Sequence, residues 1–237
     1  MQRSAYAARE LGHPAEIYVP AGTPQIKLDR LEQYGARVIA IGARYAEALA
    51  ASSARARETG ALEVHAYDHA QVLAGRGTLG RELQMQAPEL ETVFVAVGGG
   101  GLIGGVAAWY RGGCEGGRGR GRPACPTLAR ALEAGRPVDV EVGGWAADSL
   151  GARRVGTLMF PLAQQFVERV VLVSDDQIRA AQRLLWDQLR LLAEPGGSHR
   201  AGRAAIRRSA SRVPAKRGRR HRLRQQHRSG PLRMSWQ

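Results

Sequence analysis

The sequence has few cysteines, few aromatic residues and no long apolar run, and each shortage excludes a class of protein. Its 237 residues include two cysteines, Cys114 and Cys125, without a histidine cluster beside them, which indicates reduced thiols rather than a disulfide framework or a zinc site. No stretch of about 18 apolar residues occurs, so no membrane-spanning helix is expected. Residues 1–11 lack the apolar centre of a signal peptide. These absences predict a cytoplasmic protein that does not bind membranes.

Acidic residues are absent from the end of the chain. Residues 198–237 contain 13 of the 35 lysines and arginines and none of the 21 aspartates and glutamates. The formal net charge of +14 therefore belongs to this tail, and residues 1–197 are nearly neutral. We expect the tail to be disordered because its apolar residues are too sparse to bury a face. Two hypotheses stay open: the tail binds nucleic acid without sequence preference, or it is a solvated extension.

The rest of the chain alternates apolar strand patterns with helical patterns. This alternation predicts an α/β fold with mostly parallel sheets and helices on both faces, in which ligands bind at the carboxyl ends of strands. Strands are predicted at 16–19, 37–41, 62–66, 92–97 and 170–173, and helices at 23–34, 44–59, 70–86, 102–110, 126–134 and 175 to about 192. Ser174 and Gln177 have the spacing of a capping box.

The most informative motif is a buried strand, Val93–Val97, followed by Gly98, Gly99, Gly100, Gly101 and Leu102. Four successive glycines leave backbone N–H groups unshielded, and the positive end of the following helix lies behind them. Such N–H groups form an anion site, and phosphate is its natural ligand. The alternative is a tight structural turn between a strand and a helix, because glycine repeats alone are weakly specific.

Two segments interrupt the alternating pattern. Arg111–Ala124 contains glycine and arginine but no Val, Ile, Leu or Phe, so it cannot supply the buried strand expected there. The composition changes abruptly after Glu194–Gly197. A shifted reading frame in a GC-rich gene would produce both changes, and this origin is our hypothesis for 111–124 and 198–237.

Acidic residues and histidines elsewhere allow two readings. His65, Asp68 and His69 are metal-binding residue types, but we favour a crossing between domains with Asp68 or His69 near a helix start. Asp175 and Asp176 lie in the first turn of a predicted helix, where they complement its dipole. We therefore predict no metal site.

The strand and glycine loop resemble the threonine/serine dehydratases, which are pyridoxal-phosphate enzymes of the tryptophan-synthase-β fold type (fold type II). The same resemblance holds for several flanking segments in the same order. These are residues 5–12, His65–His69, Gly75–Gly80, Val173–Asp176 and Ala193–Gly197.

This resemblance implies a fold, a cofactor and a reaction. Gly98, Gly99, Gly100, Gly101 and Leu102 would hold the phosphate of pyridoxal 5'-phosphate, and a hydroxy-amino acid would lose water and then ammonia to give a 2-keto acid. The resemblance also implies a homo-oligomer and an active-site carboxylate at Glu194, whose alternative role is that of a helix-end residue. It divides the chain into a remnant of a small α/β domain (1–60), a large cofactor-binding domain (61–197) and the basic tail (198–237).

The chain departs from the family in its lysines. It has two, Lys27 in a predicted helix and Lys216 in the tail, and Lys27 reads as a solvated surface residue. In the family, the lysine that forms the Schiff base precedes the position at which this sequence starts. We therefore expect a fragment of the fold, without the Schiff-base lysine and inactive as an isolated chain.

Overall fold

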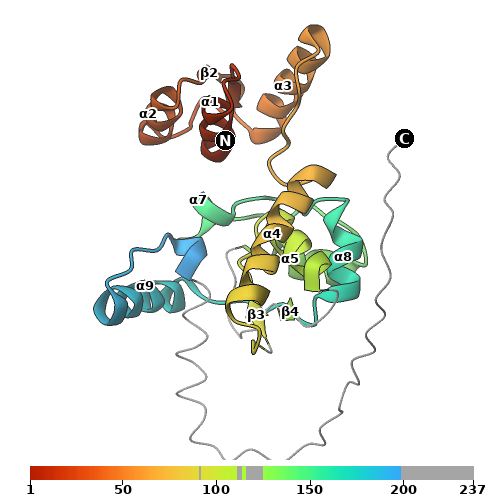
Figure 1. Ribbon diagram of the computed structural model, residues 1–237, viewed down its shortest axis with the longest axis vertical. Coiled ribbons are helices and arrows are strands. Elements are labelled where there is room, and N and C mark those ends of the chain that lie inside the picture. Colours follow the sequence, from red (N-terminus) through yellow and green to blue (C-terminus); the bar gives the residue numbers. More distant parts are fainter. Residues whose placement is uncertain (91, 111–113, 116–124, 199–237) are drawn as a thin grey trace, which may run out of the picture.

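The computed structural model describes residues 1–90, 92–110, 114–115 and 125–198, and Figure 1 shows their arrangement. Helices dominate this part of the chain. In chain order the elements are α1 (Gln2–Glu10), β1 (Glu16–Val19), α2 (Gln25–Gln33), β2 (Arg37–Ala40), α3 (Tyr45–Thr59), α4 (Ala70–Gln86), β3 (Val93–Phe94), α5 (Gly101–Tyr110), β4 (Cys114–Glu115), α6 (Thr127–Ala134), α7 (Ala147–Leu150), α8 (Met159–Phe166) and α9 (Asp175–Leu189).

The first 60 residues form a βαβ unit with one helix before it and one after it. β1 and β2 pair in parallel, with Glu16 opposite Arg37 and Val19 opposite Ala40, and α2 connects them. Val19 and Leu31 are fully buried, because α2 lays its apolar side against the strand pair. α3 ends at Gly60, which has the left-handed conformation that stops helices.

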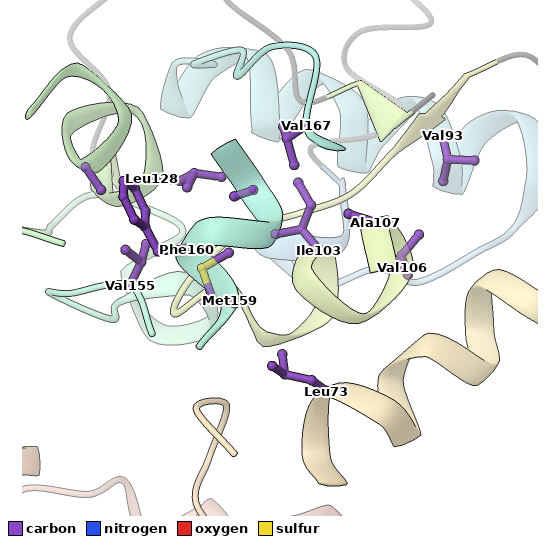
Figure 2. Packing of buried hydrophobic residues seen from close by; sticks show 12 residues of the cluster. Leu73, Val93, Ile103, Val106, Ala107, Leu128, Val155, Met159, Phe160 and Val167 are labelled. Carbon is purple, nitrogen blue, oxygen red and sulfur yellow. The ribbon is translucent and has the colours of Figure 1, made fainter. Parts of the chain in front are cut away.

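A second parallel strand pair belongs to the larger apolar core. β3 pairs with β4, and α5 connects the two strands. Figure 2 shows the core around α5, where Ile103, Val106 and Ala107 are fully buried. Met159 and Phe160 of α8 pack into the same cluster. Both strand pairs are parallel and each is connected through a helix, which agrees with the predicted α/β fold class.

Helices α4 and α5 approach each other so closely that glycine is required between them. A Cβ atom built on Gly105 would lie 2.7 Å from the backbone nitrogen of Gly77, and one on Gly77 would lie 3.1 Å from the carbonyl oxygen of Gly105. The glycines that weaken the helical pattern of 70–86 therefore allow α4 to pack backbone against backbone on α5.

Several predicted boundaries need correction. Leu62–Ala66 and Val170–Val173 are not strands, because no described strand pairs with either segment. The segment 111–124, predicted to supply no strand, contains β4 at Cys114–Glu115, since parallel pairing uses backbone groups alone. β3 is two residues long rather than six, because β4 offers only two residues to pair with it.

The last helix begins as predicted and ends early. Gln177 donates its backbone N–H to the hydroxyl of Ser174, and its side-chain oxygen accepts the Ser174 N–H, so the capping box is confirmed. Asp175 and Asp176 occupy the first turn of α9. The helix stops at Leu189 rather than near Leu192, because Arg190 takes a left-handed conformation.

Among the described helices, none has the length and apolarity needed to cross a lipid bilayer. Of the predicted tail, residues 199–237 lie outside the described part of the chain, as does most of the glycine- and arginine-rich segment 111–124.

Candidate cofactor site

The glycine loop lies between β3 and α5, where the sequence places it. Gly100 has a φ angle of +89°, a left-handed conformation that glycine adopts without strain, and α5 starts at the next residue. Gly99, Gly100 and Gly101 are buried, while Gly98 and Leu102 are half-buried.

The backbone N–H groups of this loop are not used within the described structure. None of the five residues from Gly98 to Leu102 donates its N–H to another described residue, whereas the Gly100 carbonyl accepts the N–H of Gly104 at 2.8 Å. Buried N–H groups need an acceptor, and those at the start of a helix favour an anion. The loop therefore fits a phosphate group.

Residues from three distant segments pack against the same loop. A Cβ atom on Gly99 would lie 2.5 Å from the ring of Tyr67, and one on Gly100 would lie 2.5 Å from Cε of Met159. A Cβ atom on Gly98 would lie 3.3 Å from Cα of Leu150. Glycine is thus required here because the neighbouring atoms leave no room for a Cβ atom.

His65 and Asp68 accept hydrogen bonds from backbone groups. Nδ1 of His65 accepts the N–H groups of Tyr67 (3.2 Å) and Asp68 (2.8 Å). The Asp68 carboxylate accepts the N–H groups of Thr157 (2.7 Å) and Leu158 (2.9 Å). Within the described residues, no group of three or more metal-ligating side chains gathers here or elsewhere.

His69 takes the N-cap position of α4, as the helix-start reading of this segment predicts. Asp68 has a role that the sequence does not predict, because its carboxylate binds the two residues directly before α8, about 90 residues further along the chain. An aspartate directly before a helix signals a local cap, and no signal in the sequence points to the distant helix.

The segment 193–198 reaches the glycine loop through α7. The Gly196 N–H donates to Oγ of Ser149 at 3.0 Å, and Leu150, which contacts Gly98, would also lie 3.0 Å from a Cβ atom on Gly196. The side chain of Glu194 is exposed, and its carbonyl accepts the N–H and the hydroxyl of Ser198, each at 3.0 Å. Glu194 precedes a helical turn at 195–198 and does not end α9.

Lys27 lies at the surface, as the sequence predicts, but it is half-buried and paired rather than fully solvated. Its ammonium group forms an ion pair with Asp148 of α7, and its side chain is 30% exposed. The contact joins α2 to the helix that carries Ser149 and Leu150. Lys27 is the single lysine among the described residues, and Lys216 lies outside them.

Tyrosine hydroxyls border the segment between α3 and α4. Burial raises the pKa of Tyr67, whose hydroxyl donates to the Arg154 carbonyl at 3.2 Å. Burial also raises the pKa of Tyr45 at the start of α3 to about 12, with smaller contributions from Tyr67 and Glu63. Both phenols are therefore protonated at neutral pH, and the Tyr67 hydroxyl acts as a hydrogen-bond donor.

Comparisons with known proteins agree with the fold. The family of pyridoxal-phosphate dependent enzymes matches residues 2–218. The chain is 36% identical over 205 residues to a biosynthetic L-threonine dehydratase of Pasteurella multocida, covering 83% of this chain and 39% of that protein. It is 35% identical over 199 residues to an L-threonine ammonia-lyase of Geobacter sulfurreducens, covering 83% of this chain and 50% of that protein.

Solved structures are similar over most of this chain. The processed form of threonine deaminase isoform 2 from Solanum lycopersicum has a TM-score of 0.79 at 28% identity, over 90% of this chain and 62% of that one. The chain spans about half or less of the length of the curated relatives described above. The predicted α/β architecture of fold type II is confirmed, and the chain belongs to the family of pyridoxal-phosphate dependent enzymes.

Proposed function

We propose that this chain carries the phosphate-binding part of a pyridoxal-phosphate dependent ammonia-lyase, which converts threonine or serine to a 2-keto acid and ammonia. The observation that carries the proposal is the set of unused N–H groups from Gly98 to Leu102 at the start of α5. The names of the relatives support the reaction, since they are threonine dehydratases and ammonia-lyases.

In this proposal the glycine loop holds the cofactor phosphate with backbone N–H groups from Gly98, Gly99, Gly100, Gly101 and Leu102. A pyridoxal group supplies an electron sink for the Cα carbanion of an amino acid. Tyr67 and Met159 keep the loop in its conformation by packing on Gly99 and Gly100. Glu194 is the proposed carboxylate of the site, and Gly196 attaches its segment to Ser149.

We further propose that the isolated chain is inactive. Covalent attachment of the cofactor needs a lysine amine beside the cofactor, and Lys27, the single lysine among the described residues, lies in α2, where its ammonium group pairs with Asp148 of α7. The proposed division is a small domain at 1–60, a cofactor-binding domain at 61–197 and a tail at 198–237. A cytoplasmic location and a homo-oligomer are part of the same proposal.

Absorbance spectroscopy with pyridoxal 5'-phosphate tests both parts. We expect the purified chain to bind the cofactor reversibly, so that inorganic phosphate displaces it, without a Schiff-base band near roughly 410–430 nm and without 2-keto acid from threonine or serine. A borohydride-trapped adduct on Lys27 together with keto-acid production would contradict the proposed inactivity. Cofactor binding that inorganic phosphate does not compete with would contradict the phosphate site.

The alternative function, non-specific binding of nucleic acid by the basic tail, depends on residues outside the described structure. It stays a prediction that deletion of residues 198–237 tests directly. Unchanged retention of the shortened chain on immobilised DNA would contradict it, whereas a salt-sensitive loss of retention would support it.

A further inference from the structure

Asp68 connects two segments that both touch the glycine loop. Its two carboxylate oxygens accept the N–H groups of Thr157 and Leu158, one oxygen for each N–H group. These N–H groups belong to the two residues directly before α8, and Leu158 is the N-cap residue, whose N–H has no acceptor inside the helix. The half-buried Asp68 therefore fixes the entry to a helix about 90 residues away in sequence.

The residues on either side of this contact fix the loop. Gly156, next to Thr157, donates its N–H to the carbonyl of Gly99 at 2.9 Å. Met159, the first residue of α8, lies against Gly100 and Gly104: a Cβ atom on Gly104 would be 2.7 Å from Cβ of Met159. The segment 156–159 is thus joined to Asp68 on one side and to the glycine loop on the other.

The residue before Asp68 reaches the loop as well. The Tyr67 ring covers Gly99, and the backbone of Tyr67 would lie 2.9 Å from a Cβ atom on Gly101. Asp68 therefore holds Tyr67 and Met159 in place together, and these two residues contact successive glycines of the loop.

We infer that Asp68 is a positioning residue of the phosphate site: by fixing 156–159 against Gly99 and Gly100, it holds the loop N–H groups in their anion-binding arrangement. The inference rests on the proposed function. An asparagine at 68 has one acceptor oxygen for two N–H groups, so one of them would lose its partner. Hydrogen bonds to a charged group are strong enough for this loss to matter.

The direction in which phosphate affinity changes when Asp68 loses its charge distinguishes a positioning role from a purely electrostatic one. Asp68 is negative and close to a loop that binds an anion, so removal of its charge would by Coulomb's law strengthen phosphate binding. A positioning role predicts weaker phosphate binding instead, because the N–H groups of a relaxed loop no longer converge on one phosphate group. A purely structural cap predicts a lower melting temperature and no change in phosphate affinity.

The test compares Asp68→Asn with Asp176→Asn in the full chain. Asp176 is also an aspartate at a helix start, but its side chain is 93% exposed and contacts Arg179 rather than the loop. Calorimetric titration with inorganic phosphate gives the dissociation constant, and a thermal melt gives the stability. We expect Asp68→Asn to raise the phosphate dissociation constant about tenfold, and Asp176→Asn to leave it unchanged.

A second pair of variants tests the same contact without changing any charge. A Cβ atom on Gly156 would lie 2.5 Å from Oδ1 of Asp68, so Gly156→Ala pushes against the carboxylate, whereas a Cβ atom on Gly143 would meet nothing within 4 Å. We expect Gly156→Ala to weaken phosphate binding and Gly143→Ala to leave it unchanged. This pair also tests whether the contact between Asp68 and the segment 156–159 positions the loop if Asp68→Asn fails to fold.

Each outcome has a separate meaning. Weaker phosphate binding by Asp68→Asn or Gly156→Ala, with normal binding by the controls, supports the inference. Unchanged or tighter binding by both of these variants overturns the inference and leaves the proposed function intact. An unsubstituted chain that binds no phosphate overturns the proposed function, and the positioning role with it.

Discussion

The helix-ending glycines of the first 60 residues and the glycines of the segment 98–105 are present for different reasons. Gly12, Gly35 and Gly60 follow helices with φ angles of +71° to +74°, and a Cβ atom on any of them would meet nothing within 4 Å. In the segment 98–105, Gly100 alone has a positive φ angle, yet a Cβ atom on most of its glycines would collide with a neighbour. The first group serves local backbone geometry, and the second serves tertiary packing around an anion site.

The strongest test of this difference is Gly105→Ala. A Cβ atom there would lie 2.7 Å from the nitrogen of Gly77 and would also collide with the carbonyl oxygen of Leu73. These are backbone atoms of α4, so relief requires α4 and α5 to separate. We expect a loss of about 3 kcal/mol in the free energy of unfolding, measured by urea denaturation. A loss below about 1 kcal/mol would show that the helix pair is loosely packed.

Gly100→Ala tests backbone conformation and tertiary packing at one position. The φ angle of +89° strains an alanine, and its Cβ atom would lie 2.5 Å from the flexible end of Met159. We expect a loss of about 2 kcal/mol in the free energy of unfolding and a clear loss of phosphate affinity by titration calorimetry. Normal phosphate binding by a folded Gly100→Ala variant would contradict the role of the loop.

Gly60→Ala isolates the backbone reason. Its φ angle is +71° and the space around its Cβ position is open, so conformational strain is the expected cost. We expect a loss of about 1 kcal/mol in urea denaturation. Phosphate affinity should not change, and a change would mean that the end of α3 influences the loop.

Gly75→Ala replaces a glycine that has neither a positive φ angle nor a close tertiary neighbour. It lies inside α4, has no positive φ angle, and a Cβ atom there would meet nothing within 4 Å. Alanine is the better helix former, so we expect a gain of about 0.5–1 kcal/mol in the free energy of unfolding. A loss would reveal a packing role for Gly75 beyond the described residues.

The same contrast explains how much of the fold the sequence could predict. Helices with local signals were predicted well: α3 stops at Gly60 and α9 begins with the capping box of Ser174 and Gln177. Strands were predicted less well, because a strand exists only where another strand pairs with it. Val170–Val173 has the composition of a strand without a described partner, whereas Cys114–Glu115 pairs with β3.

The candidate site divides in the same way. The glycine loop could be predicted because strand, glycines and helix follow one another in sequence, and the structure places Gly98–Leu102 at the start of α5. The residues that pack against the loop could not be predicted, since Tyr67, Met159 and Leu150 come from three separate segments. Asp68 acts over about 90 residues, a distance at which no spacing rule operates.

The most direct test of the central claim is a phosphate titration of the full chain labelled with ¹⁵N-glycine, followed by amide chemical shifts. The account predicts saturable shifts confined to the amides of Gly98, Gly99, Gly100 and Gly101, with the amides of Gly12, Gly35 and Gly60 unmoved. Shifts spread evenly over both groups of glycines, or no shifts at all, would contradict it.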